Sequence, residues 1–90
     1  MQDDHDIIKE LQNGNQLSFE KLVKKHLPST MGFFFKITGD RMVSEDLSQD
    51  VFFKLYKNIK QFRFESSFST YFFRIKLNTA NSWLRSNKWK

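Results

Sequence analysis

Cysteine is absent from the 90-residue sequence, and proline and glycine are scarce, with one and three residues respectively. Without cysteine the chain can form neither disulfides nor thiolate metal sites, so packing alone must hold its core. Glycine and proline are too few for the many tight turns of an all-β domain. Apolar runs such as Phe33–Phe35 are far too short to span a bilayer, and the acidic N-terminus carries no such run. We therefore expect a soluble, cytoplasmic protein with no membrane insertion.

Negative charge is nearly missing from the second half of the chain. Residues 51–90 hold nine lysines and arginines against Glu65 alone, whereas residues 1–50 hold six against nine acidic residues. The net charge of +5 is therefore concentrated in one half of a chain whose length suits a single domain. Such a basic half indicates a polyanionic partner, of which nucleic acid is the commonest. An anionic membrane surface and a merely solvated face are the alternatives.

Apolar residues recur with helical periodicity through most of the chain. We predict an all-α fold, a compact bundle of three to four helices that forms one domain over residues 1–90. The expected helices span about residues 4–11, 18–38, 44–59 and 67–87.

The second predicted helix has a recognisable start, middle and end. Ser18 is expected to cap it, with Leu17 and Leu22 as a hydrophobic staple. Pro28 predicts a kink rather than a break, although two shorter helices are an alternative. Gly39 should end the helix. Its expected apolar side consists of Phe19, Leu22, Val23, His26, Leu27, Phe33, Phe34 and Ile37.

The third predicted helix should begin at Ser44, a good N-cap that is followed by two acidic residues. Its helical wheel places on one arc, as core, Leu47, Val51, Phe52, Leu55, Tyr56 and Ile59. The opposite arc holds Asp46, Gln49, Asp50, Phe53 and Lys57. A solvated face with one stray aromatic would explain this arc. The functional alternative is a protein-binding site in which Phe53 is the apolar anchor and Asp46 and Asp50 select a basic partner.

The fourth predicted helix, capped by Ser66, Ser67 or Ser69, separates into a core arc and a polar arc. The core arc is Phe68, Phe72, Phe73, Ile75, Leu77, Ala80, Trp83 and Leu84. The polar arc is Tyr71, Arg74, Asn78, Asn81, Ser82, Arg85 and Lys88. Cations neutralise phosphates, amides pair with base edges and a tyrosine stacks on a base, so the polar arc is typical of nucleic-acid binding.

The segment before the fourth helix interleaves aromatics with cations, namely Lys60, Phe62, Arg63, Phe64 and Phe68. This pattern suits a single strand whose unpaired bases are splayed out. A membrane-surface helix would instead keep its aromatics opposite its cations, free to insert.

Neither histidine predicts a catalytic or metal site. His5 lies in an acidic terminus that we expect to be frayed, and His26 lies on an apolar stripe as a hydrogen-bonded core residue. No nucleophile is paired with a base, and no glycine-rich phosphate loop occurs. We expect no enzyme and no cofactor.

The order of these elements resembles the second conserved region of bacterial sigma factors, in particular the extracytoplasmic-function group. The resemblance covers about residues 17–88 and is carried by "GDRMVSEDLSQDVFFKLYKNIKQF", a short loop and "FSTYFFRIKLNTANSWLR". Each piece alone is weak, but their order and spacing are specific.

The resemblance implies a helical domain that binds the clamp helices of the largest catalytic subunit of RNA polymerase and opens the promoter at its minus-ten element. By position, the polymerase-binding residues would be Asp46, Gln49, Asp50 and Phe53. The segment Lys60–Ser69 would capture a base flipped from the non-template strand. The helix that contacts promoter DNA would use Tyr71, Arg74, Asn78 and Arg85, and Lys88 lies on the same arc.

Some features depart from the family pattern. Tyr71 and Ser82 stand where many relatives carry tryptophan and aspartate, and the 90 residues do not include the family's usual C-terminal helix-turn-helix domain. We expect a fragment of a longer sigma factor, with a shortened regulatory relative as the alternative. Two other readings stay open: a small helical module that acts alone on duplex DNA, and a protein-interaction domain whose partner is an anti-sigma factor.

Overall fold

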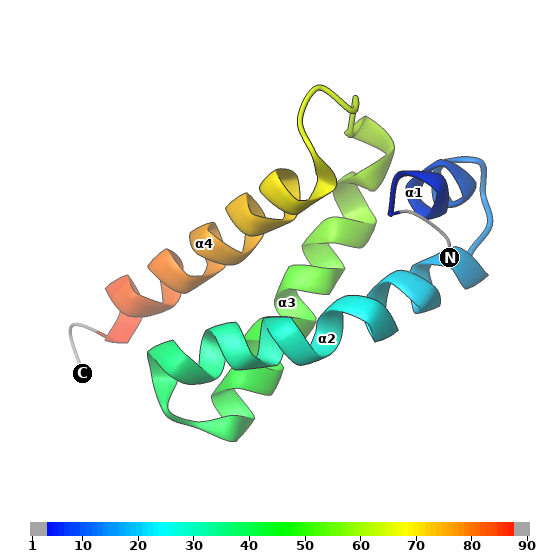
Figure 1. Cartoon of the computed structure of the whole chain (residues 1–90). Coiled ribbons are helices and arrows are strands. Elements are labelled where there is room, and N and C mark those ends of the chain that lie inside the picture. Colours follow the sequence, from blue (N-terminus) through cyan, green and yellow to red (C-terminus); the bar gives the residue numbers. More distant parts are fainter. Residues whose placement is uncertain (1–3, 88–90) are drawn as a thin grey trace.

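The computed structural model describes residues 4–87, and all of its regular elements there are helical (Figure 1). The elements are α1 (Asp4–Gln12), α2 (Leu17–Thr38), α3 (Arg41–Asn58), the short 3-10 helix η1 (Ile59–Gln61) and α4 (Phe68–Asn87). The predicted all-α fold is confirmed. Lys88, one of the residues expected to bind DNA, lies outside the described residues.

Helix α3 is the central element of the bundle. It packs against both α2 and α4, which contact each other much less, and α1 covers the start of α2 and η1. The core is formed by Ile7, Ile8, Leu11, Leu22, Phe34, Val51, Phe52, Leu55, Ile59, Phe62, Phe68, Phe72 and Ala80.

Several small polar residues are buried inside the bundle. Ser18, Thr30, Ser44 and Ser48 are fully buried, and each hydroxyl has a hydrogen-bond partner. The Ser48 hydroxyl, for example, donates to the carbonyl of Ser44 at 2.7 Å. Among the described residues, no buried side-chain nitrogen or oxygen lacks a partner. These hydroxyls therefore occupy the core without the cost of an unpaired polar group.

The helix α2 ends where expected but begins differently. Gly39, with φ of 66°, adopts the left-handed conformation and donates its N–H to the carbonyl of Phe35, and α2 runs unbroken through Pro28. The predicted start is wrong. Ser18 is a buried residue of the first turn that donates to Glu10 Oε2 at 2.6 Å, because α1 packs over this end. Leu17 is 67% exposed, so it does not form the expected staple.

The helix α3 begins three residues before the predicted cap. Asp40, not Ser44, is the N-cap: its Oδ1 accepts the N–H of Val43 at 3.1 Å. Aspartate caps helices as well as serine does, and the left-handed Gly39 turns the chain so that Asp40 directly precedes the helix. Ser44 is instead buried inside α3 and donates to the carbonyl of Asp40.

The apolar arc of α4 is only partly covered. Phe68, Phe72 and Ala80 are buried, but three residues expected in the core are 41–47% exposed, namely Phe73, Leu77 and Leu84. A helix that packs chiefly against one neighbour buries a narrower stripe than its apolar arc, and α4 contacts α2 little. The prediction that the whole arc is core is therefore wrong.

Candidate nucleic-acid and protein interfaces

The outer surface of α3 carries the predicted protein-binding residues. Asp46, Gln49, Asp50 and Phe53, called here the α3 face, are all exposed, and the Phe53 side chain is 61% exposed. Lys54 Nζ lies 3.1 Å from Asp50 Oδ2, and Lys57 Nζ lies 5.6 Å from the centroid of the Phe53 ring. The Asp50–Lys54 pair is solvated on both sides, so it contributes little to stability and leaves Asp50 open to another partner.

The Phe53 ring borders an apolar depression between α2 and α3. This α2–α3 groove, of about 660 Å³, is lined mainly by Phe19, Val23, Leu27, Phe52, Phe53 and Tyr56, with Gln16, Glu45 and Gln49 as its polar lining residues. The sequence assigned Leu27 and Tyr56 to the core, but they are 39% and 43% exposed. That part of the prediction is wrong. Apolar residues that line an open groove recur along a helix with the same spacing as residues in a covered core, so the sequence pattern does not distinguish the two.

Aromatic residues in and beside the loop between η1 and α4, residues 62–67, are more buried than the sequence predicted. Phe62 and Phe68 are 7% and 2% exposed and pack with Tyr71 and Phe72. Their rings are occupied by core contacts, so the structure contradicts the expectation that bases stack on them. Phe64 is half-buried. The alternation of aromatics and cations therefore reflects a loop anchored to the core rather than a row of free stacking platforms.

Polar side chains surround a depression beside this loop. The loop hollow, of about 400 Å³, is lined by Gln61, Phe62, Arg63, Glu65, Ser66, Tyr71 and Arg74. A second hollow of about 420 Å³ adjoins it and is lined by Asn58, Gln61, Tyr71, Arg74, Ile75 and Asn78. The structure thus brings together Arg63, Tyr71, Arg74 and Asn78 from the predicted DNA-binding set. It adds Gln61 and Glu65, which sequence reasoning missed because it searched this segment for cations and aromatics.

Tyr71, which lines both hollows, is partly buried against the core. The Tyr71 and Phe62 centroids are 4.7 Å apart, and the Tyr71 hydroxyl lies 3.5 Å from the carbonyl of Asn58. Burial raises the pKa of the Tyr71 hydroxyl. It therefore stays protonated at neutral pH and keeps its ability to donate a hydrogen bond.

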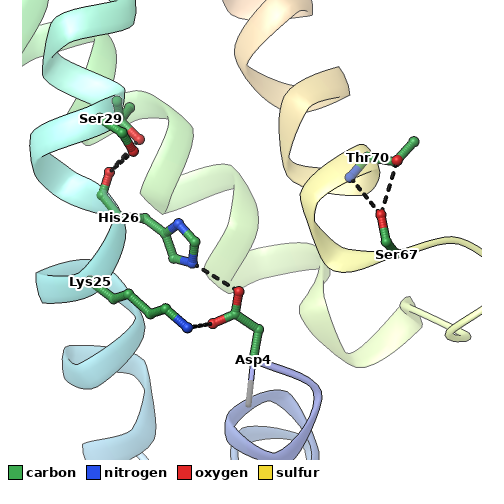
Figure 2. Close-up of polar contacts among 7 residues, drawn as sticks. Asp4, Lys25, His26, Ser29, Ser67 and Thr70 are labelled. Atoms are coloured by element: carbon green, nitrogen blue, oxygen red, sulfur yellow. Dashed lines mark hydrogen bonds and ion pairs between the residues drawn. The ribbon is translucent and has the colours of Figure 1, made fainter. Parts of the chain in front are cut away.

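The remaining predicted DNA-binding residues are not gathered in the hollows. Lys60, Ser69 and Arg85 are exposed, and none of them lines either hollow. Arg85 lies near the C-terminal end of α4, where its Nη2 is 3.4 Å from Ser82 Oγ. Ser67, one of the three predicted caps, caps α4 by accepting the N–H of Thr70 at 3.1 Å (Figure 2).

Comparison with known proteins decides the family. Residues 22–90 match the Sigma-70 region 2 family. The chain belongs to this family. It is 31% identical over 81 residues to the RNA polymerase sigma-H factor of Pseudomonas aeruginosa, covering 90% of this chain and 42% of that protein. It is also 31% identical over 83 residues to the ECF RNA polymerase sigma-E factor of Escherichia coli, again covering 90% and 42%.

A solved structure supports both the family and the fold. The complex of an engineered region 2 of sigmaE with GTAAAA matches with a TM-score of 0.82 and 27% identity, over 97% of this chain and 90% of that one. This sigma region 2 chain spans less than half the length of the two curated relatives. The resemblance to extracytoplasmic-function sigma factors is confirmed, and the family is not enzymatic.

The sigma region 2 domain also has a polar cluster that ties α1 to α2. Asp4 Oδ1 accepts from Lys25 Nζ at 2.8 Å, and Asp4 Oδ2 lies 3.2 Å from His26 Nε2 (Figure 2). The expectation of a frayed terminus is therefore wrong from Asp4 onward. His26 is hydrogen-bonded, as predicted, but it lies at the margin of the core: its side chain is partly exposed, and the rings of Phe68 and Phe72 pack against it. Burial lowers the pKa of His26, and the nearby Asp4 carboxylate partly offsets this effect.

The structure of the described residues also bears on two other features, metal sites and membrane-spanning helices. Within residues 4–87, no group of three or more His, Asp or Glu side chains is arranged to hold a metal ion. None of the helices in the part of the chain that the structure describes is both long and apolar enough to cross a membrane.

Proposed function

We propose that this chain is the promoter-recognition and promoter-melting domain of an extracytoplasmic-function sigma factor. In this role it binds the minus-ten non-template strand through the loop hollow and α4, and the clamp helices of RNA polymerase through α3. Its place of action is then the bacterial cytoplasm. The observation that carries the proposal is the loop hollow itself, which combines a tyrosine and two arginines in a family whose solved relative is bound to GTAAAA.

The composition of the loop hollow suits a nucleotide better than a bare phosphate. Arg63 and Arg74 supply positive charge for the backbone, and Tyr71 supplies an aromatic surface. Glu65, the only acidic residue after Asp50, lies in the same hollow. A carboxylate repels phosphate but accepts hydrogen bonds from base amines. The hollow therefore favours a base edge beside Glu65 and the strand backbone beside the arginines.

The energies explain why melting needs a partner. Unpairing and unstacking a base costs a few kcal/mol, whereas stacking on an aromatic side chain contributes about 1–3 kcal/mol per base. Phosphate contacts add a salt-dependent term. These amounts nearly cancel, so the isolated domain should bind single strands weakly and the polymerase should supply most of the remaining free energy.

The α3 face and the adjoining α2–α3 groove suit a helical protein partner. Phe53 offers an exposed anchor next to an apolar depression, and Asp46 and Asp50 add negative charge around it. A basic amphipathic helix pair can insert apolar side chains into the groove while its cations meet these carboxylates. The polymerase clamp helices are the partner that we propose for this surface.

The proposal can be tested by fluorescence anisotropy. Labelled single-stranded and duplex oligonucleotides of matched sequence, including GTAAAA, are titrated with the chain at two salt concentrations, with and without a clamp-helix fragment. We expect preference for a particular single strand, strengthened by the fragment. Duplex binding that ignores the fragment would instead identify a module that acts alone on duplex DNA.

A second candidate rests on the exposed apolar residues of α4. Phe73, Leu77 and Leu84 are each about half exposed, and α4 contains no acidic residue. An acidic amphipathic helix, such as one from an anti-sigma factor, would cover the apolar stripe and pair with Arg74 and Arg85 beside it. Loss of single-strand binding on addition of such a helix would support this role.

A further inference from the structure

The helix α1 contacts the segment that leads into the loop hollow. Gln12, the last residue of α1, donates from Nε2 to two carbonyls, that of Ile59 at 2.9 Å and that of Phe62 at 3.0 Å. Ile59 is the first residue of η1, and Phe62 is the residue directly after the end of η1. One side chain therefore fixes both ends of the turn that precedes the loop.

A second contact between α1 and the loop lies at Phe64. This residue has φ of 61°, a left-handed conformation that is unfavourable for any residue with a side chain. Its ring lies 4.9 Å from the His5 ring and 4.7 Å from the Phe62 ring, and Lys9 Nζ is 5.8 Å from its centroid. Packing against α1 therefore supports a backbone conformation that the loop would not adopt by itself.

The direction of Phe64 determines what its neighbours do. Phe64 packs toward α1, whereas the residues on either side of it, Arg63 and Glu65, both line the loop hollow. A change at Phe64 to an ordinary negative φ would redirect the chain at this point. The charged lining of the hollow would then be lost although no hollow residue had changed.

We propose that α1 is a positioning element for single-strand capture, which acts through two positioning residues: Gln12 at its own end and Phe64 of the loop, which packs against it. The inference rests on the function proposed above. The core contribution of α1 comes from Ile7, Ile8 and Leu11, which are buried. The hydrogen bonds of Gln12 serve a different purpose, because they connect α1 to backbone 47 and 50 residues away and fix the geometry of the loop.

The test compares matched variants of the whole chain. Wild type first enriches a preferred strand from a single-stranded library with six randomised positions. That strand is then labelled, and an abasic site is placed at each of the six positions in turn. Wild type should lose about tenfold affinity at the position whose base enters the hollow, which is within the contribution of one stacked base.

Three variants separate positioning from folding. Gln12→Ala should reduce the tenfold preference for the base over the abasic site to less than about threefold, with unchanged affinity for the abasic strand. Gln12→Lys keeps a donor for the two carbonyls and should restore the preference. Asn13→Ala is the control, because it deletes a neighbouring exposed amide that makes no hydrogen bond to the loop. Circular dichroism during thermal unfolding identifies a temperature at which all three variants are folded.

Each outcome decides one question. A wild-type chain that enriches no strand, or shows no position sensitive to base removal, overturns the proposed function itself. A sensitive wild type with an equally sensitive Gln12→Ala variant overturns only the role of α1. If Gln12→Ala does not fold, Phe64→Ala is measured in its place, and retention of the full preference there also overturns the inference.

Discussion

The α2–α3 groove and the loop hollow are both open to solvent, but their construction is opposite. The groove is formed mainly by side chains of α2 and α3, and its lining is mostly apolar with Glu45 as the one acidic residue. The hollow is formed by a loop against one helix, and charged or polar side chains make up most of its lining. An apolar groove beside the exposed carboxylates of α3 suits a basic helical protein, and a polar hollow with arginines suits a nucleic-acid strand. One small domain thus presents two chemically different surfaces on different elements.

The strongest test of this separation changes the α3 face. Asp50→Lys combined with Phe53→Ala removes the exposed anchor and reverses one charge, each expected to cost about 1–2 kcal/mol. Binding of the polymerase clamp-helix fragment should weaken about 100-fold, measured by anisotropy or calorimetry. Single-strand binding by the same variant should stay within about twofold of wild type, and a comparable loss there would show that the two surfaces are not independent.

The reciprocal change is made on α4. Arg74→Ala with Asn78→Ala removes one cation and one amide from the two hollows. Single-strand affinity should fall about 10- to 30-fold, which corresponds to roughly 1.5–2 kcal/mol, and the salt dependence should become shallower because one phosphate contact is lost. Titration at two salt concentrations checks both effects. Clamp-helix binding should not change, and a parallel decrease would contradict the division.

The N-cap of α3 provides a change in stability that touches neither surface. Asp40→Ala should lower the free energy of unfolding by about 1 kcal/mol, because the N–H of Val43 loses its acceptor. Urea denaturation measures this loss. Asp40→Asn should recover most of it, and both variants should bind strand and clamp fragment as wild type does at a temperature where they are folded.

The effect expected to be smallest is a pH dependence centred on His26. Because burial lowers the pKa of His26 below its ordinary 6.5, the unfolded chain takes up a proton more readily than the folded chain between the two values. Neutral His26 therefore makes its full contribution to the free energy of unfolding above about pH 6.5. This contribution is lost as the pH falls from 6.5 through the lower pKa of the folded state. Asp4 opposes the shift, whereas Lys25 and Lys76 reinforce it.

The measurement for His26 is the melting temperature at pH 7.5 and at pH 5. It should be lower at pH 5, and His26→Gln should flatten the difference. Since His26 packs against Phe68 and Phe72 at the start of α4, hydrogen exchange at pH 5 should increase near the loop hollow before it increases at the α3 face. Equal increases at both would show that the two regions respond as one unit.

Much of this architecture follows from local pattern. The spacing of apolar residues predicted the four helices, the exposure of Phe53 and the end of α2 at Gly39, because these depend on helix period and on the backbone preferences of single residues. The motif order from Gly39 to Arg85 identified the family. The unequal charge of the two halves indicated a polyanionic partner for the second half, and both arginines of the loop hollow belong to that half.

Other features depend on contacts between distant segments. A helical wheel shows which side of a helix is apolar but not whether a neighbour covers it, so Tyr56 and Leu84 were assigned to the core although both are exposed. The same limit hid the burial of Phe62. The cap at Asp40 is a local feature, and it was missed because aspartate and serine are equally good N-caps and the pattern favoured Ser44. The sequence by itself determined the helices, their charges and the family. Only the tertiary structure decided which apolar rings remain accessible and that Gln12 holds the loop, because both depend on packing between residues far apart in the chain.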